Sequence, residues 1–436
     1  MNVGSQARAC PVVHGFDPLS QEFLADPYGG LGQVRDQGPV FFSPVLDRWV
    51  VTGYAEIEQV LLDPSTFSAV EAQRTLYPVC PEAAAILGGL ELLPTMSNAD
   101  PPRHTRFRSV IMRALSPRRM AKLEPVIQDR AIALIDAFLA GGGTDGTGGT
   151  GGDRPASRRG DIVAALCHPL PAATLFALIG FPPGDAEQIK AWCEDKIEVN
   201  WGRPSAEQQV RSAHSMVAFL DHCRALVRAR RARPADDLTS DLVADERELT
   251  DEEAASILFA LSFAGHETTT NMLGNALFQL LSRPGLWDRL RADRGLIPGA
   301  VEETLRFDTS VPMWRRVSTR KTVLGGVTLP EGARLVLSFG AAGHQPDRFP
   351  DPDRFDIERA GARRQLSFGK GIHLCAGASL ARLEGRIVLD ALADRLPGLR
   401  LAPGYEPRYP ANISFRGPRE LWVEWVADPI TASATR

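Results

Sequence analysis

A glycine-rich loop that leads directly into a helix constrains this chain more than any other feature. The loop reads Phe368-Gly-Lys-Gly-Ile-His-Leu-Cys-Ala-Gly377, and an apolar repeat typical of a helix follows it to about residue 396. Glycines permit a tight loop whose backbone approaches other groups closely. The free N–H groups at a helix N-terminus favour a thiolate. The pattern therefore predicts that Cys375 is a metal ligand or a nucleophile, with a buried thiol as the simplest alternative.

The surroundings of Cys375 narrow these alternatives. The six cysteines are scattered and form no C-x-x-C pair, so structural disulfides are not expected in a reducing compartment. A zinc site needs further ligands at suitable spacing, and only His373 lies nearby. A cysteine nucleophile needs a general base, and none is evidently placed. A single thiolate suits haem iron, because the porphyrin supplies the four equatorial donors.

The motif F-G-x-G-x-H-x-C-x-G, followed by Leu380-Ala-Arg382, resembles the haem-binding loop of the cytochrome P450 family. This resemblance implies haem b (iron protoporphyrin IX) as the cofactor, with Cys375 as its axial thiolate and metal ligand. It also places Phe368 and Gly369 against the cofactor. A thiolate in this position donates electron density that favours O–O cleavage.

A second segment resembles the same family at the middle of a long helical pattern. From Thr250 onward, apolar residues recur at helical spacing, and the stripe continues into Ala264-Gly-His-Glu-Thr268. This pentapeptide resembles the family's oxygen-binding segment. The resemblance implies that Ala264 and Gly265 lie beside the haem and that Glu267 and Thr268 relay protons to bound dioxygen. Glycine and threonine also weaken regular helix hydrogen bonding, so a local groove is expected there.

Three charged side chains are expected to form a buried structural triad. Glu303 and Arg306 are three residues apart on an apparent helix, where such side chains meet. In the family this pair joins an arginine from a Pro-rich segment. Pro352-Asp-Arg354-Phe resembles that segment, which makes Arg354 the expected third member. Because buried charges depend on one another, the loss of one member should be severely destabilising.

Four basic residues are expected to hold the haem propionates. His104 and Arg108 are four apart, so they share one helical face. Arg316 and His373 match two further family positions that contact propionates. Arg315 is adjacent to Arg316, and the sequence leaves the register between these two arginines open.

The resemblance also indicates where a substrate would lie. The positions expected in the pocket are apolar and several are aromatic, which favours a hydrophobic small molecule. These residues are Phe176, Phe263, Val311, Trp314 and Ile413.

The order of predicted elements indicates a mainly α fold with a small β region. Residues 40–42 and 49–51 predict a hairpin, residues 102–290 are overwhelmingly helical in pattern, and residues 323–339 return to strand character. The P450 resemblance implies a long central helix over the haem. We expect residues 1–436 to form one haem-thiolate monooxygenase domain. Within it, the glycine-rich stretch at 141–160 is expected to be a flexible loop insertion between two helices.

Charge and hydropathy exclude several classes of protein. Lysine plus arginine number 49 and aspartate plus glutamate 53, so a net charge of −4 drives no binding to nucleic acid or membrane. No apolar stretch reaches the roughly 20 residues that a membrane span needs, and the first residues lack a signal-peptide pattern. A cytoplasmic protein is expected. The segment 101–123 holds seven basic residues and no acid, which suits an acidic redox partner.

Together with these residues, the resemblance to the P450 family implies a haem-thiolate monooxygenase that activates dioxygen and hydroxylates or oxidatively dealkylates a hydrophobic small molecule. The chain shows no ferredoxin cluster pattern and no nucleotide-binding fingerprint. Two electrons, ultimately from NAD(P)H, are therefore expected from a separate ferredoxin or flavodoxin with its reductase, unless the chain is an excised haem domain. A peroxide-driven peroxygenase and a non-catalytic haem-thiolate sensor are the alternatives.

Overall fold

The computed structural model describes residues 10–88, 90, 93–141, 157–244 and 249–426, and helices dominate it. The α-helices are α1 Gln21–Ala25, α2 Pro27–Val34, α3 Tyr54–Leu62, α4 Pro81–Gly88, α5 Arg103–Ala114, α6 Pro117–Ala140, α7 Pro169–Ile179, α8 Ala186–Trp201, α9 Ala206–Ala232, α10 Leu238–Leu242, α11 Asp251–Leu281, α12 Leu286–Ala292, α13 Ile297–Phe307, α14 Phe339–Gly343 and α15 Ala378–Arg395. Short helical turns are η1 Arg35–Gln37, η2 Val163–Cys167, η3 Pro183–Asp185, η4 Arg294–Leu296, η5 Ala362–Arg364 and η6 Gly371–His373.

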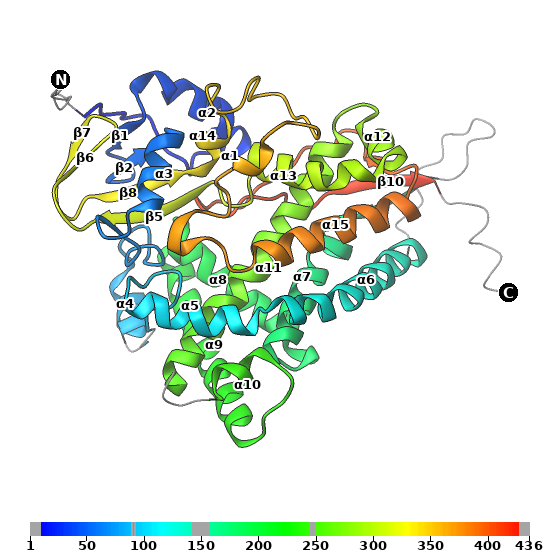
Figure 1. Ribbon diagram of the computed structural model, residues 1–436, viewed down its shortest axis with the longest axis horizontal. Helices are drawn as coiled ribbons and strands as arrows, with labels where there is room; N and C mark the ends of the chain where they lie inside the picture. Colours follow the sequence, from blue (N-terminus) through cyan, green and yellow to red (C-terminus); the bar gives the residue numbers. More distant parts are fainter. Residues whose placement is uncertain (1–9, 89, 91–92, 142–156, 245–248, 427–436) are drawn as a thin grey trace.

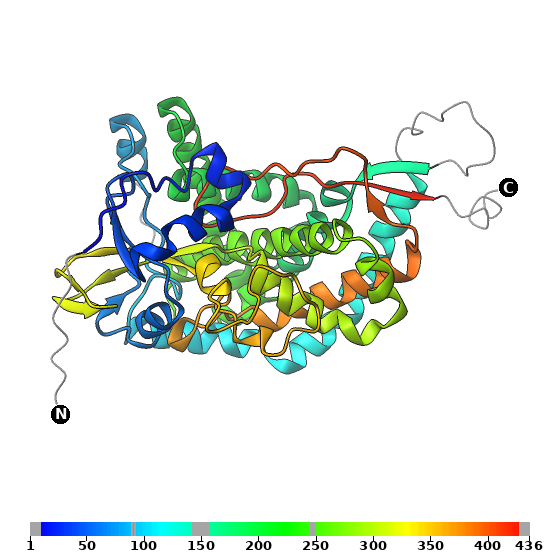
Figure 2. The ribbon, with the colours of Figure 1, turned by 90° about the horizontal axis from the view of Figure 1, so that it is seen from above.

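The strands form three small sheets. They are β1 Val40–Ser43, β2 Arg48–Val51, β3 Phe67–Ser68, β4 Ser157–Asp161, β5 Met313–Ser318, β6 Thr322–Leu324, β7 Val327–Leu329, β8 Arg334–Ser338, β9 Arg400–Leu401 and β10 Trp422–Val426. One sheet has the order β1-β2-β8-β5-β3, in which β2 and β8 are parallel and the other pairs antiparallel. The others are β4-β10-β9 and the hairpin β6-β7. The five-stranded sheet and the three-stranded sheet lie at opposite ends of the molecule (Figures 1 and 2).

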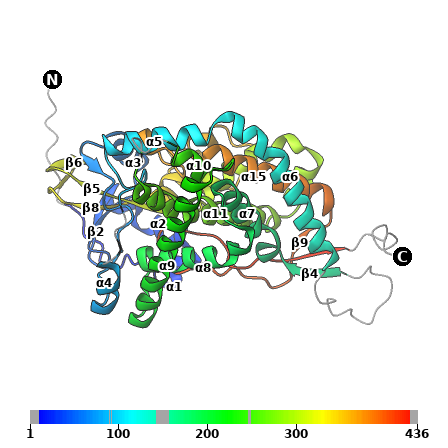
Figure 3. The same cartoon turned by 90° about the horizontal axis from the view of Figure 1, so that it is seen from below.

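Helix α11 forms the centre of the helical part. It begins with a capping box in which the Thr250 hydroxyl accepts from the Glu253 N–H and the Glu253 carboxylate accepts from the Thr250 N–H. Most of its residues are buried, because α7, α8, α9, α13 and α15 pack around it. Seen from below, α5, α6 and α15 run along one side of the molecule, while α8, α9 and α11 lie across its middle (Figure 3).

These elements confirm the predicted mainly α fold with a small β region, including the hairpin of β1 and β2, whose turn contains Asp47 at φ 52°. One boundary was wrong: residues 157–160 belong to β4, which pairs with β10, and not to a loop. The rest of the predicted insertion, residues 142–156, lies outside the described residues. Its flanks, α6 and the segment from Ile162 onward, contribute to the same core cluster. Within the described ranges, no helix is long and apolar enough to cross a membrane.

Candidate active site

The loop before α15 is held in a shape that glycine makes possible. Gly369 and Gly371 have φ of +69° and +67°, a left-handed conformation that other residues rarely adopt. A Cβ at Gly371 would lie 2.5 Å from the carbonyl oxygen of Leu61 on α3, so the loop also packs closely on that helix. The Cys375 N–H donates to the Phe368 carbonyl oxygen at 2.9 Å. These contacts fix Cys375 three residues before the start of α15.

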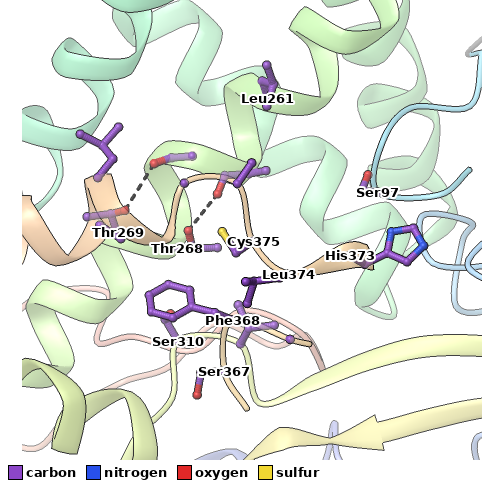
Figure 4. A pocket seen from close by; sticks show the side chains of 18 of the residues that line it. Ser97, Leu261, Thr268, Thr269, Ser310, Ser367, Phe368, His373, Leu374 and Cys375 are labelled. Carbon is purple, nitrogen blue, oxygen red and sulfur yellow. Dashed lines mark hydrogen bonds between the residues drawn. The ribbon is translucent and has the colours of Figure 1, made fainter. Parts of the chain in front are cut away.

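The thiol of Cys375 faces a cavity. Its side chain is accessible from that cavity, although the surrounding protein displaces most of the bulk water (Figure 4). This desolvation raises the pKa of Cys375, while the N–H groups of Gly377 and Ala378 and the charges of Arg108 and Arg382 partly offset it. The predicted helix-terminus effect is therefore present, but burial outweighs it in the protein without a metal ion.

The cavity has a volume of about 250 Å³ and a mostly apolar wall. The cavity lies between the Cys375 loop and α11. Helix α11 is therefore the long central helix that the sequence predicted. The wall includes many of the residues predicted to contact cofactor or substrate: Ala264, Gly265, Thr268, Phe368, Gly369, Phe263, Val311 and Trp314. It also includes residues that the sequence did not single out, among them Ser97, Leu175, Leu178, Ser310 and Phe339.

Two predicted pocket residues do not line this cavity. Phe176 is 3% exposed and packs its ring edge-on against Phe181 and His266, on the far side of the α7 residues that face the cavity. Ile413 is buried at a separate small pocket, and its N–H donates to the Trp201 carbonyl oxygen at 3.0 Å. Phe415, two residues later, occupies the cavity wall instead.

Four basic side chains gather at one end of the site, as predicted. The rings of His104 and His373 lie 4.4 Å apart, and Arg108 Nη1 donates to the Leu374 carbonyl oxygen at 2.7 Å. Arg316 lines the cavity, whereas the Arg315 side chain donates to the backbone of the loop at residues 72–74. Alternate residues of strand β5 point to opposite faces, so Trp314 and Arg316 share the cavity side. Of the two arginines, Arg316 is therefore the one on the cavity side.

This basic cluster has unused hydrogen-bonding capacity. His104 Nε2 is buried without a hydrogen-bond partner, and the His373 ring is buried with at most a weak bond to the Met96 backbone, an arrangement that costs free energy unless a ligand satisfies it. Burial lowers the pKa of His104, and burial with the Arg316 charge lowers that of His373 to about 3, while backbone hydrogen bonds to Ile372 and Met96 act in the opposite direction. Both rings are therefore neutral at pH 7, and each has a single N–H donor. The pKa of Arg316 falls only to about 10, which leaves it cationic.

The donor set fits a haem. No acidic side chain lines the cavity among the described residues, although the charge of Asp100 acts on Arg316 and His104 from outside the wall. Two carboxylates entering beside Arg108 and Arg316 would therefore meet cationic donors. Nor do those residues contain a group of three His, Cys, Asp or Glu side chains that could hold a metal ion. Cys375 is thus suited to a metal whose remaining ligands come from the cofactor, and not to a protein-ligated zinc.

Helix α11 is continuous past the predicted oxygen-binding segment, so the expected interruption is absent from this helix. Thr268 Oγ1 donates to the Ala264 carbonyl oxygen at 2.8 Å and the residue lines the cavity (Figure 4). Glu267 does not line it. Burial, with a contribution from Glu194, raises the pKa of the Glu267 carboxyl to about 7, and Asn271 Nδ2 donates to it at 3.3 Å.

The structure corrects the third member of the buried triad. Glu303 and Arg306 are fully buried and paired, with Arg306 Nη2 2.7 Å from Glu303 Oε1. Arg359, not Arg354, completes the set: its Nε lies 3.0 Å from the same oxygen and its side chain is 7% exposed. The Arg354 side chain is 69% exposed and pairs with Asp356. Only the backbone carbonyl of Arg354 joins the cluster, by accepting from Arg306 and Arg359.

The basic segment 101–123 is less uniform than its sequence implies. Arg106 pairs with Glu253, and Arg119 pairs with Asp236 and Asp241. Other basic residues are exposed on α5 and α6: Arg103, Arg113, Arg118 and Lys122.

Comparisons with known proteins agree with this geometry. The cytochrome P450 family model matches residues 205–395. The chain is 36% identical to the cytochrome P450 monooxygenase PikC of Streptomyces venezuelae over 427 residues, an alignment that covers 96% of this chain and 95% of PikC. It is 35% identical to the erythromycin C-12 hydroxylase of Saccharopolyspora erythraea, over 84% of this chain and 86% of that relative. The solved structure of cytochrome P450 CREJ in complex with (4-ethylphenyl) dihydrogen phosphate matches with a TM-score of 0.87 and 35% identity, over 94% and 99% of the two chains. A lone cavity-facing thiol beside a basic cluster, on a fold and sequence this similar, shows that the chain belongs to the cytochrome P450 family of monooxygenases.

Proposed function

We propose that this protein inserts one oxygen atom of dioxygen into a hydrophobic small molecule, using two electrons delivered by a separate redox partner. The observation that carries the proposal is the Cys375 thiol facing a mostly apolar cavity whose wall also includes Arg108, Arg316 and His373. Hydroxylation is the reaction we favour, because a relative of similar sequence is named a hydroxylase. Oxidative dealkylation is a second outcome of the same chemistry.

The residues around the cavity have separate roles in holding haem b. Cys375 would ligate the haem iron through its thiolate, and Phe368 and Gly369 would pack the loop against the cofactor. His104, Arg108, Arg316 and His373 bind the propionates, which is supported by their position at one end of the cavity. When bound, the haem supplies the redox chemistry that activates dioxygen.

Glu267 and Thr268 are the proposed proton-delivering residues. The Thr268 hydroxyl is at the cavity wall, whereas Glu267 is withdrawn from it one residue away on α11. A carboxyl whose pKa is about 7 holds a proton on about half of the molecules at neutral pH, which suits a group that must both release and regain it. We expect protons to pass from Glu267 to the cavity through the Thr268 hydroxyl or water beside it.

The redox partner is proposed to be a ferredoxin or flavodoxin reduced by NAD(P)H through its own reductase. Exposed cations on α5 and α6 support docking of an acidic protein there, because complementary charge raises association rates. Neutralising Arg113 and Arg118 should weaken partner-dependent reduction and its dependence on salt. Unchanged reduction rates at low and high salt would contradict this docking site.

The function is tested by the ferrous–CO spectrum of purified Cys375→Ser, compared with wild type and with Cys80→Ser. Cys80 is a thiol whose Sγ contacts the Ala206 carbonyl oxygen outside the cavity, so it is a matched control. We expect a strongly red-shifted Soret band in wild type and Cys80→Ser that disappears in Cys375→Ser. A colourless wild type, or a spectrum indifferent to the loss of Cys375, would refute the proposal. Product formation with hydrogen peroxide but not with redox partners would identify a peroxygenase.

A further inference from the structure

Ser97 is a polar position in the wall of an otherwise mostly apolar cavity (Figure 4). Its Oγ is the midpoint of a chain of hydrogen bonds that joins Gln73, Ser97 and Thr95. Gln73 Nε2 lies within hydrogen-bonding distance of Ser97 Oγ on one side, and Thr95 Oγ1 lies 3.1 Å from it on the other. Whether Ser97 donates or accepts toward the cavity depends on which direction these two bonds run.

The first direction is set by Lys196 on α8. Its amine is 1% exposed, lies 3.4 Å from the ring centre of Phe263 and donates to Gln73 Oε1 at 3.0 Å. Because Lys196 Nζ donates to Gln73 Oε1, the amide oxygen of Gln73 faces Lys196 and its NH₂ group faces Ser97. Asn200, one turn later, donates from Nδ2 to the Gln73 carbonyl oxygen at 2.8 Å and fixes the same residue to α8.

The second direction is set at the other end of the chain, independently of the charge on Lys196. The Thr95 N–H can only donate, and it lies 2.8 Å from Asn98 Oδ1, which identifies that atom as an acceptor. Thr95 Oγ1 lies 3.0 Å from the same oxygen and therefore gives its one hydroxyl proton to Asn98. The contact between Thr95 and Ser97 is then a hydrogen bond only if Ser97 donates its proton to Thr95 Oγ1.

Both ends thus agree on the state of Ser97. Its proton is used by Thr95 and one lone pair is used by Gln73, which leaves one lone pair on an oxygen at the cavity wall. Such a hydroxyl accepts a hydrogen bond but donates none. A carboxylate, which also only accepts, does not complement it, so Ser97 is unsuited to a haem propionate.

We infer that Ser97 is a specificity-determining residue that accepts a hydrogen bond from a hydroxyl or N–H group of the substrate. The inference rests on the proposed function and narrows its substrate class to apolar molecules that carry such a donor. Molecules of the same shape whose polar group is a ketone or an ether leave Ser97 unsatisfied and are disfavoured. Gln73 and Lys196 act through Ser97 and are positioning residues.

The inference is tested by spectral titration of the haem-loaded enzyme with matched alcohols and ketones. The probes are cyclooctanol with cyclooctanone and cyclododecanol with cyclododecanone, which differ little except in their hydrogen-bond donor. We expect wild type to bind the alcohols about tenfold more tightly than the ketones. Ser97→Ala should abolish this preference. The ratio of alcohol to ketone affinity that remains in Ser97→Ala measures any preference that comes from direct contact between the alcohol and the iron.

Thr95→Val is the sharper variant, because it removes the acceptor of the Ser97 proton while keeping the side-chain shape. The freed proton can then point into the cavity, so the preference should move toward the ketones. Ser109→Ala, on the exposed face of α5, is the matched control and should retain the wild-type ratio.

Equal binding of alcohols and ketones by wild type, an unchanged ratio in Ser97→Ala, or failure of every alcohol to bind would overturn the inference. Each variant is first examined by its ferrous–CO spectrum. A normal spectrum with no alcohol preference refutes only the role of Ser97, whereas loss of the haem-thiolate spectrum in wild type refutes the proposed function itself.

Discussion

Replacing Arg359 by alanine should remove a large part of the chain's stability, although no sequence motif marks this residue. Its side chain is 7% exposed and donates four hydrogen bonds: to Glu303 Oε1, and to the carbonyl oxygens of Pro350, Asp351 and Arg354. These bonds join α13 to the segment that precedes the cysteine loop. Arg359→Ala breaks all of them at once.

Two estimates give a similar magnitude for this loss. Removal of one partner of a buried ion pair costs about 3–5 kcal/mol, and four hydrogen bonds at about 1 kcal/mol each give about 4 kcal/mol. Arg306 stays beside Glu303 and keeps its carboxylate compensated, which favours the lower end. We therefore expect a loss of about 3 kcal/mol.

The assay is equilibrium unfolding of the haem-loaded enzyme in urea, followed by circular dichroism. With an m-value of about 3 kcal/mol per molar urea, Arg359→Ala should lower the midpoint by about 1 M. Arg354→Ala is the matched control: its side chain is 69% exposed, and loss of its pairing with Asp356 should change the stability by less than about 0.5 kcal/mol. Equal losses in the two variants, or a larger loss in Arg354→Ala, would refute the reasoning.

Other parts of the site give further tests. Burial raises the pKa of Glu267 to about 7 from 4.5, so the folded chain keeps a proton that the unfolded chain releases, and the resulting stability is lost as pH rises through 7. In urea titrations, the free energy of unfolding of Glu267→Gln minus that of wild type should therefore rise by about 3 kcal/mol between pH 5 and 8. A difference that does not change with pH would contradict this. Arg316→Leu should speed haem transfer to apomyoglobin about tenfold by removing a charged donor, and an unchanged rate would count against a propionate site. Gly371→Ala should cost about 1–3 kcal/mol in urea unfolding, because φ is +67° and the new Cβ would lie 2.5 Å from the Leu61 carbonyl oxygen. Gly184→Ala, which meets open space, should change little, and similar losses in both would contradict the strain argument.

The sequence predicted those features that depend on local pattern. The hydrophobic period of α11 is local, and so is the tight glycine loop before Cys375. The ordered motifs also named Cys375, Thr268, Arg108, Arg316 and His373, which the structure brings to the wall of one cavity. These predictions succeeded because the relevant residues lie within one element or one loop, where spacing determines which side chains meet.

Register was the point at which local pattern failed. Arg354 and Arg359 are both arginines in a loop with no repeating geometry, so spacing from a proline cannot decide which one turns inward. Within strand β5 the two-residue period showed that Arg315 and Arg316 face opposite sides, but not which side holds the cavity. That choice is set by the pairing of Arg316 with Leu335 on β8, a contact between distant residues.

Ser97 illustrates a stronger limit on sequence-based prediction. A serine in an irregular loop has no period and no motif, and its hydrogen-bonding direction is fixed by partners brought from elsewhere. Gln73 lies 24 residues before Ser97, and Lys196 lies 123 residues after Gln73, on helix α8. The polarity of that single hydroxyl is therefore a property of the tertiary structure. Because the apolar wall can accept many shapes, such a fixed polar contact discriminates between substrates of equal size, and its direction distinguishes an alcohol from the corresponding ketone.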